Sequence, residues 1–400
     1  MRKSLINKHF VIIANAALGK GLSGSDRIFI EISKRLSSTF DISVCVWEEG
    51  FQMCQRQNLT GVRYEKWFLY NLKNLPFLFC YFLRIFSGIY YAIKFSNKGY
   101  KQEDCFFYSA SDFWQDFIPF IILKIRFPKS KFISSFYLEA PNPLIGFRRE
   151  YENKIQIPKI KDFLYYFAQF LPKQLIPKIS DYIFVTSEPD KSYFISRGFD
   201  AEKVLVIMGG VDFSKYNSLK TKIEKKYDAV FYGRFHPQKG VLELIDIWSI
   251  LIKKLPDAKL VMIGDGPLTD IVREKIHSLK LEKNILLKGH LDDSIEKYEL
   301  FAQSKVVVHP AVYDSGGMAS AEVMFLGIPG VSFDLEALKT YYPKGMLKSK
   351  CFDLKGFSDN IFKLLTEKDF YQKTSTQAKE CVLENFDWDK KCEFIIKTIL

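Results

Sequence analysis

The stretch Asp228-Ala-Val-Phe-Tyr-Gly-Arg-Phe-His-Pro-Gln-Lys-Gly240 begins as a short apolar run, passes through a loop with two cations, and leads into a helical pattern at 240–254. An apolar run of strand length followed by a longer helical pattern indicates a βα unit. The same alternation recurs on both sides, with strands expected at 10–14, 42–47, 105–108, 131–137, 259–263, 284–287, 305–308 and 330–333. Repeated βα units predict an α/β fold with Rossmann-like, doubly wound parallel sheets.

The length of the chain predicts two domains, because 400 residues exceed one ordinary domain. Its composition, 48% apolar and 26% charged, is typical of a globular protein with a large core. Residues 214–227 are polar and charged, so we expect a linker at 213–227 between an N-terminal domain, 1–212, and a second domain, 228–385.

The net charge of +12 resides mainly in the first half, where residues 1–200 hold 28 Lys and Arg against 18 Asp and Glu. Within it, residues 51–100 carry seven cations and the single acid Glu65, interleaved with aromatic residues. This mixture suits an anionic surface such as phospholipid headgroups or nucleic acid. It equally suits helices whose cations are solvated while their aromatic side chains pack inward.

Cysteine spacing and hydropathy indicate the compartment. The seven cysteines form no CxxC pair or His-spaced cluster, which predicts neither zinc nor disulfides and favours a reducing cytoplasm. The apolar run near the N-terminus is shorter than a signal-peptide core, so we expect a first strand there. The apolar stretch 75–95 is interrupted by Pro76, Arg84 and Gly88, which favours a packed or interfacial helix over a transmembrane one.

Two cations and a helix start make the loop after 228–232 a candidate phosphate site. Arg234 and Lys239 both emerge from this strand-to-helix loop. Cations beside the positive end of a helix suit a diphosphate.

A second candidate loop follows the buried strand 305–308. It contains Asp314, Gly316 and Gly317 and leads into a helix with Glu322. The glycines allow backbone amides to approach a ligand closely, and a carboxylate such as Glu322 can accept two hydrogen bonds from a ribose diol. Alternatively, the glycines form a tight helix entry capped by Asp314, and Glu322 belongs to an ion pair.

Taken in order, these motifs resemble the C-terminal domain of GT-B glycosyltransferases of family 4, over about residues 200–400. The resemblance is carried by the GR…KG loop at 233–240, by Gly289 after a further strand, and by the segment from Asp314 to Glu322. Two further matches are Gly209-Gly-Val-Asp212 and Ile263-Gly-Asp-Gly-Pro267. The resemblance implies two Rossmann-like domains that face each other across a cleft, a nucleotide-sugar donor and retention of anomeric configuration.

Residue roles in the second domain follow from the same resemblance. It implies that Arg234 and Lys239 neutralise the diphosphate and that Glu322 holds the ribose. It also implies that the amides at Gly316, Gly317 and Met318 face the donor sugar or phosphate, with Gly266 and Gly24 as further donor-binding positions. Asp314 stands where the family has Glu, one methylene longer, so we expect a catalytic carboxylate with a shorter reach.

The first half resembles the family's acceptor domain more loosely. Many members place a His near the segment that here is Phe136-Tyr-Leu-Glu-Ala-Pro-Asn-Pro143, and Glu139 is the nearest titratable residue in this chain. We therefore take Glu139 as the acceptor-side candidate. Residues 386–400 resemble the family's terminal helix, which packs back on the first domain.

The predicted function is transfer of a sugar from a nucleoside-diphosphate sugar to a glycan or lipid-linked acceptor in cell-envelope polysaccharide or glycoconjugate synthesis. We expect a cytoplasmic enzyme, peripheral on the inner face of the membrane, with no nucleic-acid partner and no cofactor. No Asp-x-Asp motif precedes the site, and Asp292-Asp293 lies outside the pattern, so no metal is expected.

Three alternatives remain from the sequence. Gly19-Lys-Gly-Leu-Ser-Gly24, followed by Glu48 and Glu49, matches the dinucleotide fingerprint of an NAD-type oxidoreductase, although four residues separate strand and first glycine. An epimerase or hydrolase would use the same donor site without an acceptor. A non-enzymatic membrane or nucleic-acid binding module would rest on charge alone.

Overall fold

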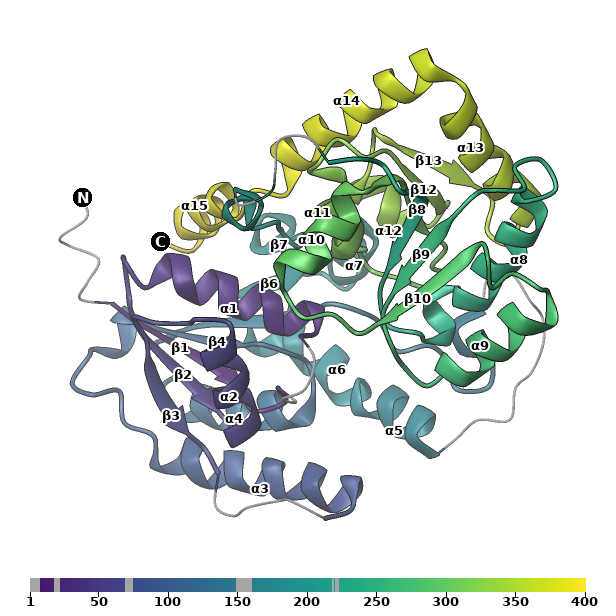
Figure 1. Cartoon of the computed structure of the whole chain (residues 1–400). Coiled ribbons are helices and arrows are strands. Elements are labelled where there is room, and N and C mark those ends of the chain that lie inside the picture. Colours follow the sequence, from purple (N-terminus) through teal and green to yellow (C-terminus); the bar gives the residue numbers. More distant parts are fainter. Residues whose placement is uncertain (1–7, 18–21, 69–74, 149–159, 218, 220–222) are drawn as a thin grey trace. The chain divides into compact units, whose positions relative to one another are not determined.

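The computed structural model of the chain describes residues 8–17, 22–68, 75–148, 160–217, 219 and 223–400. It divides into two compact units. The first unit comprises the described residues of Met1–Ala140, Pro158–Gly209 and Trp388–Leu400, and the second those of Pro141–Ile157 and Gly210–Asp387. Each unit is built on its own parallel sheet flanked by helices (Figure 1).

The first unit contains a seven-stranded parallel sheet in the order β3-β2-β1-β4-β5-β6-β7. Its strands are β1 (His9–Ala14), β2 (Asp41–Val46), β3 (Arg63–Lys66), β4 (Cys105–Ser109), β5 (Lys131–Phe136), β6 (Tyr182–Val185) and β7 (Val204–Val206). Its helices are α1 (Gly24–Leu36), α2 (Glu48–Arg56), α3 (Phe77–Lys94), α4 (Trp114–Arg126), α5 (Ile160–Ala168), α6 (Phe170–Ile179), α7 (Glu188–Ile195) and α15 (Trp388–Ile399).

Two apolar cores cover the two faces of this sheet. One core joins α1, α2 and α15 to the strands, and Trp388 and Ile395 of α15 are buried in it. The other joins α4, α6, α7 and the end of α3 to the opposite face, with Phe117 and Phe120 fully buried. The last helix of the chain, α15, is therefore part of the first unit, and Arg35 of α1 is paired with Asp389 at 2.5 Å.

The second unit contains a six-stranded parallel sheet in the order β10-β9-β8-β11-β12-β13. Its strands are β8 (Tyr227–Tyr232), β9 (Leu260–Ile263), β10 (Ile285–Gly289), β11 (Ser304–His309), β12 (Gly330–Phe333) and β13 (Met346–Ser349). Its helices are α8 (Val241–Leu251), α9 (Thr269–Ser278), α10 (Ile295–Ala302), α11 (Met318–Met324), α12 (Glu336–Tyr341), α13 (Leu354–Thr366) and α14 (Lys368–Asn385).

The structure differs from the expected linker at 213–227. Phe213–Tyr216 forms a 3-10 turn, η5, that packs onto the second unit. The ring of Phe213 stacks on Phe325 at 4.6 Å between centroids, and Tyr216 lies 4.8 Å from Tyr298. Two aromatic anchors in four residues give this segment enough apolar surface to pack, so the second unit already begins at Gly210.

The basic aromatic segment 51–100 combines features of both alternatives. Several of its cations are paired with acids, as Lys66 is with Glu48 at 3.7 Å and Lys98 is with Glu65. The alternative in which the aromatic side chains pack inward does not describe all of α3, where Phe79 and Phe86 are 54% and 61% exposed. No helix among the described residues is long and apolar enough to cross a membrane.

Candidate active site

The predicted donor-site residues of the second unit follow two adjacent strands. The strand order β10-β9-β8-β11-β12-β13 reverses its direction between β8 and β11, which pair through Ala229 and Val306. Ligands of open parallel sheets bind outside the carboxyl ends of the strands at such a switch point. Arg234 and Lys239 follow β8, and Asp314 follows β11, so the topology brings both predicted loops to this position.

The two loops are in direct backbone contact. The amide of Val312 donates to the carbonyl of Gln238 at 2.9 Å. Gly240 has a φ of +63°, and a Cβ built on it would lie 1.8 Å from the carbonyl oxygen of Pro310. Only glycine permits this backbone approach, so the Gly of the KG pair is required to seat one loop on the other.

Lys239 and Asp314 form the central ion pair of this site. The Nζ of Lys239 donates to Oδ2 of Asp314 at 2.6 Å, and the Nε2 of His309 lies 3.1 Å from the same oxygen. The other oxygen, Oδ1, accepts from the amides of Ser315 at 2.9 Å and Gly316 at 3.3 Å. Asp314 therefore has contacts at both carboxylate oxygens while its side chain is only 8% exposed.

Asp314 is held as an anion despite its burial. Burial alone would raise the pKa of this carboxyl, but the charge of Lys239 and the hydrogen bond and charge of His309 outweigh it and hold the pKa well below the usual value. Because the carboxylate keeps its charge, the loops retain a fixed negative charge beside the ammonium of Lys239.

Arg234 differs from Lys239 in having no carboxylate partner among the residues that the structure describes. It lies just beyond β8 and is exposed to solvent. A guanidinium without a protein counter-ion can pair with an anionic ligand in a bidentate manner. The assignment of Arg234 and Lys239 to a diphosphate stays a prediction, with Arg234 available and Lys239 shared with Asp314.

Glu322, the predicted ribose ligand, lies buried in α11 and is paired with a lysine that sequence reasoning missed. The Nζ of Lys297 lies 2.9 Å from Oε2 of Glu322 and also contacts Asp293. Lys297 is fully buried over the rings of Tyr232 and Tyr298, at 4.9 and 4.7 Å from their centroids. Its position three residues into a polar helix gave no sequence signal, because lysines there are normally solvated.

The charge of Lys297 is secured by its surroundings. Burial alone would lower its pKa, but the carboxylates of Glu322 and Asp293 and the tyrosine Tyr232 raise the pKa above the usual lysine value. Asp293 is further paired with Lys215 of η5 at 2.6 Å. This chain of ion pairs holds Glu322 in one orientation.

Gly316 and Gly317 are tightly packed, which agrees with the alternative that this pair forms a compact helix entry. Gly317 has a φ of +78°, and a Cβ on it would lie 2.9 Å from Nε2 of His309. A Cβ on Gly316 would lie 2.5 Å from Cζ of Tyr341. Met318 begins α11 directly after them and is half-buried. Donor contact through these three residues stays a prediction.

The glycine at 266 joins another pair of loops. A Cβ on Gly266 would lie 2.5 Å from the carbonyl oxygen of Phe235, and the amide of Phe235 donates to the backbone carbonyl of Asp265 at 2.9 Å. The loop after β9 therefore supports the loop that carries Arg234. Gly24, the other glycine assigned to the donor, is the exposed first residue of α1 in the first unit, and residues 18–21 of its predicted loop lie outside the described residues.

Glu139, the acceptor-side candidate, lies after β5 in the first unit. Its Oε1 accepts from Nζ of Lys173 at 2.6 Å. Two further carboxyls follow the neighbouring strands: buried Asp112 after β4, and half-buried Asp190 in the first turn of α7 after β6. Burial raises the pKa of Asp112 to about 6, and burial together with the nearby charge of Glu139 raises that of Asp190 to about 7. Sequence reasoning did not select these two carboxyls as site residues.

An aromatic residue outside the predicted set also reaches the loops of the second unit. Phe147, in the turn η3 (Gly146–Arg148), lies 5.2 Å from His236 and 5.6 Å from Tyr313, measured between ring centroids. It therefore contacts the loop after β8 and the loop after β11 together.

Comparisons with known proteins agree with this arrangement. Residues 213–381 match the model of the family "Glycosyl transferases group 1". The glycosyltransferase MJ1069 of Methanocaldococcus jannaschii is 26% identical over 285 residues, which cover 68% of each chain. The capsular polysaccharide biosynthesis glycosyltransferase CapM of Staphylococcus aureus is 24% identical over 249 residues, covering 58% of this chain and 64% of CapM.

A solved structure has the same fold over nearly the whole chain. Anabaena HepE in complex with UDP and glucose superposes with a TM-score of 0.70 at 15% identity, covering 98% of this chain and 99% of HepE. Several other curated relatives are matched over only 23% to 52% of their own length.

Two doubly wound units with loops of this kind at the switch point of the second define a protein with the GT-B glycosyltransferase fold. The predicted α/β, two-domain fold class is therefore confirmed. Within that class, residues 213–381, which hold the predicted donor site, match the model of the group 1 glycosyltransferases, and the chain is similar to members of that group. The dinucleotide oxidoreductase is correspondingly not favoured.

Proposed function

We propose that this chain is a retaining glycosyltransferase that moves a sugar from a nucleoside-diphosphate sugar to a glycan or lipid-linked acceptor in the synthesis of a cell-envelope polysaccharide. The observation that carries the proposal is the meeting of the Arg234–Lys239 loop with the Asp314 loop at the β8/β11 switch point. The UDP and glucose bound to HepE and the capsular role named for CapM support the donor and acceptor classes.

The chemistry follows from where charge develops. As the bond between the anomeric carbon and the diphosphate breaks, negative charge grows on the departing phosphate oxygens. Arg234 would pair with that charge, and Lys239 would share its ammonium between the phosphate and Asp314. Glu322, oriented by Lys297, would accept from the ribose hydroxyls. The acceptor hydroxyl would then bond to the anomeric carbon on the face that the diphosphate leaves, and its proton would pass to the departing phosphate oxygen.

The compartment and the absence of a metal are parts of the same proposal. All seven cysteines are free, which fits a reducing cytoplasm. We place the protein on the inner face of the cell membrane, where lipid-linked acceptors are glycosylated. Because Arg234 and Lys239 supply the positive charge, transfer should proceed at an undiminished rate in the presence of EDTA.

The test measures turnover and nucleotide binding together. A thermal-shift panel of nucleoside diphosphates and their sugars identifies the donor, and NADH serves as the negative control. With that donor, Arg234→Ala should lower turnover at least ~100-fold, as expected for loss of one preorganised charge partner of the transition state. The matched control is Arg273→Ala in α9, an exposed arginine that is paired with the exposed Asp270. Near-normal turnover of Arg234→Ala would refute the assignment.

A further inference from the structure

Helix α3 presents an apolar stripe to solvent. Seven large apolar residues recur at spacings of three and four residues along the helix and the two residues before it, and each is 39% to 61% exposed. They are Leu75, Leu78, Phe79, Phe82, Phe86, Tyr90 and Ile93. This spacing places them on one face of the helix.

The opposite face of α3, which contacts the protein, is closely packed and combines apolar residues such as Ile85 and Ala92, 5% and 0% exposed, with buried polar contacts. Arg84 is 4% exposed, donates to the carbonyl of Asn15 at 3.2 Å and pairs with Glu49 at 3.1 Å. Ser87 donates to the carbonyl of Trp67 at 2.7 Å. These polar contacts, together with the buried Ile85 and Ala92, anchor the helix with its apolar stripe toward water, whereas an ordinary surface helix turns its polar face to water. The stripe is therefore held outward by specific hydrogen bonds.

A second apolar stripe lies on α5 and continues into α6. Its members are again spaced by three or four residues, and each is 37% to 76% exposed. They are Ile160, Phe163, Leu164, Phe167 and Phe170, with Tyr166 beside them.

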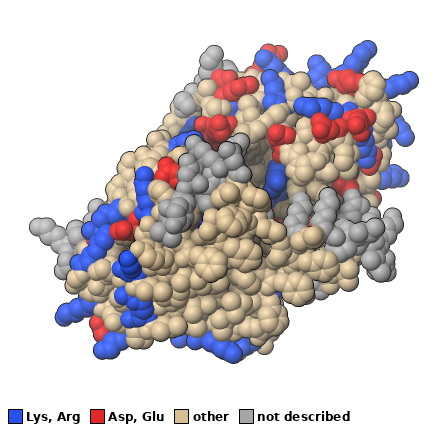
Figure 2. Space-filling model, turned by 90° about the horizontal axis from the view of Figure 1, so that it is seen from below, with Lys and Arg blue, Asp and Glu red and all other residues tan. Residues whose placement is uncertain are grey.

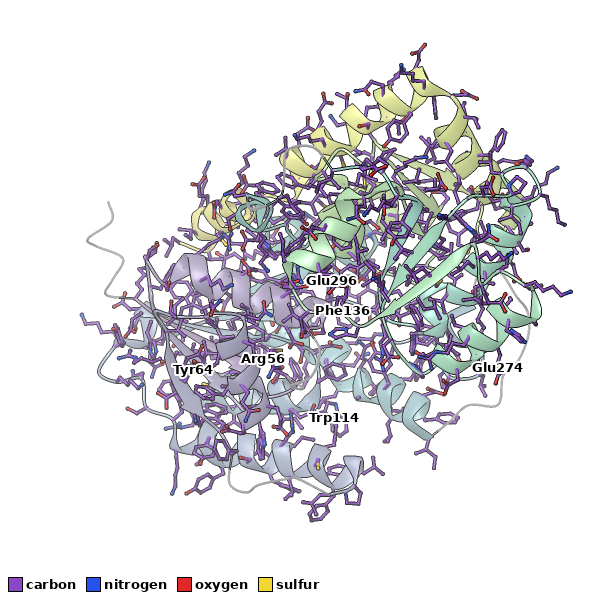
Figure 3. The ribbon with its side chains drawn as sticks, in the orientation of Figure 1. Arg56, Tyr64, Trp114, Phe136, Glu274 and Glu296 are labelled. Atoms are coloured by element: carbon purple, nitrogen blue, oxygen red, sulfur yellow. The ribbon has the colours of Figure 1, made fainter. Side chains whose placement is uncertain are left out.

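Trp114, the first residue of α4, connects the two stripes. Its Nε1 donates to the carbonyl of Ala168 in α5 at 2.7 Å, and its backbone lies next to Tyr81 of α3. Figure 3 shows Trp114 between the ribbons of α3 and α5. Figure 2 shows a broad surface without charged side chains on the side of the molecule where these helices lie. We call the two stripes together the α3–α5 face.

The α3–α5 face is larger than the apolar patches of ordinary soluble proteins. The exposed fractions of its eight aromatic side chains add up to about four whole side chains, or on the order of 800 Å². The largest apolar patch of a typical monomer is about 300–600 Å² and is often functional. Leaving this surface in water is unfavourable, so the face requires a partner.

Cations border the face where the helices end. Lys94 ends α3 and lies over the ring of Tyr90 at 4.4 Å, while Arg126 ends α4 and is exposed. Lys129 follows α4 and is 74% exposed, with a loose contact to Glu103 at 3.6 Å. Asp162 is the acid within the α5 stripe and is half-buried. Figure 2 shows Lys and Arg side chains along the margin of the uncharged surface.

We propose that the α3–α5 face docks this protein onto an anionic phospholipid bilayer. Aromatic rings with a cationic border suit the interface, because the rings enter the boundary between headgroups and acyl chains while the cations pair with lipid phosphates. A second copy of the chain is a poorer occupant, since it would bring its own cations against the same border. The docking rests on the proposed function only for its purpose, which is to bring the acceptor-side unit to a lipid-linked acceptor.

The test is sedimentation with vesicles at low and high salt. Wild-type protein should sediment with mixed phosphatidylcholine–phosphatidylglycerol vesicles at low salt and not with pure phosphatidylcholine vesicles. Phe82→Ser with Phe86→Ser, and separately Phe167→Ser with Phe170→Ser, should each weaken binding at least ~10-fold, because two inserted rings are lost. Ile271→Ser with Leu286→Ser is the matched control, since both residues are comparably exposed in the second unit.

The outcomes separate this proposal from the proposed function. The serine variants should keep their unfolding midpoint and their donor hydrolysis or transfer to a water-soluble acceptor, because the altered side chains are already in solvent. Failure of wild type to sediment at low salt, or unchanged sedimentation of both variants, overturns the docking without touching the enzyme assignment. A concentration-dependent mass that both variants abolish would instead assign the face to self-association and also overturn the proposal.

Discussion

Replacing Lys297 by Met tests whether the buried ammonium holds Glu322 in place. Methionine keeps the apolar length that lies over Tyr232 and Tyr298 but removes the charge. The carboxylates of Glu322 and Asp293, whose side chains are only 5% and 15% exposed, would then lose their contact with this ammonium. Breaking a buried pair by removing one partner costs about 3–5 kcal/mol. Because Lys215 still contacts Asp293, we expect a loss near the lower limit, about 3 kcal/mol.

The assay is urea unfolding of Lys297→Met, Glu322→Gln and the variant with both changes, combined with titration of the nucleoside diphosphate. The variant with both Lys297→Met and Glu322→Gln should recover at least ~1 kcal/mol of the summed single losses, since neither buried charge then lacks its partner. Lys254→Met is the matched control, because its pair with Asp359 is exposed and should contribute less than ~1 kcal/mol. If Lys297→Met is no less stable than this control, or if the two losses simply add, the positioning role is wrong. In the folded variant, nucleotide affinity should fall while the pH profile of turnover stays unchanged.

Two further predictions concern pH and backbone. Burial raises the pKa of Asp116 to about 7 from 3.8, so the native state binds this proton more tightly than the unfolded state does. The stabilising contribution of this proton is complete below pH 4 and is lost as the pH rises through about 7, a change of about 4 kcal/mol. Asp116→Asn should therefore flatten the pH dependence of the unfolding free energy over this window. An unchanged slope would contradict the assignment. Gly240→Ala should lower turnover and the unfolding midpoint together, because its Cβ would lie 1.8 Å from the carbonyl oxygen of Pro310, whereas the exposed Gly99→Ala, with no atom within 4 Å, should leave turnover unchanged. Normal activity of Gly240→Ala would show that the two loops need not touch.

The strand pattern was the part of the fold that the sequence predicted best. Strands β1, β8 and β11 each contain a short apolar run, at 10–14, 229–232 and 306–308, and these runs indicate a buried parallel sheet. The loops that follow β8 and β11 were predicted for the same reason, since a loop after a buried strand must emerge at the carboxyl edge of the sheet.

Other features depended on contacts between residues far apart in the chain. The orientation of α3 could not be predicted, because an aromatic helix in sequence is normally assumed to pack its rings inward; here Arg84 and its partners at Asn15 and Glu49 turn the rings outward. Lys297 and Glu322 are 25 positions apart, so their pairing has no local signature. The 3-10 turn at Phe213–Tyr216 was missed because its two aromatic residues lie in a polar stretch.

The shorter acid at 314 acquires a physical meaning from its contacts. Oδ1 of Asp314 accepts from two amides of its own loop, and Oδ2 is occupied by Lys239 and His309. A carboxylate with both oxygens occupied and a side chain 8% exposed has little capacity left for a sugar hydroxyl. If the predicted donor site is right, the charge of Asp314 would act through Lys239, whose ammonium would divide its hydrogen bonds between this carboxylate and an incoming phosphate. Arg234, which has no such partner among the described residues, would then meet the phosphate first, and Lys239 would strengthen its own contact only as charge builds on the leaving group.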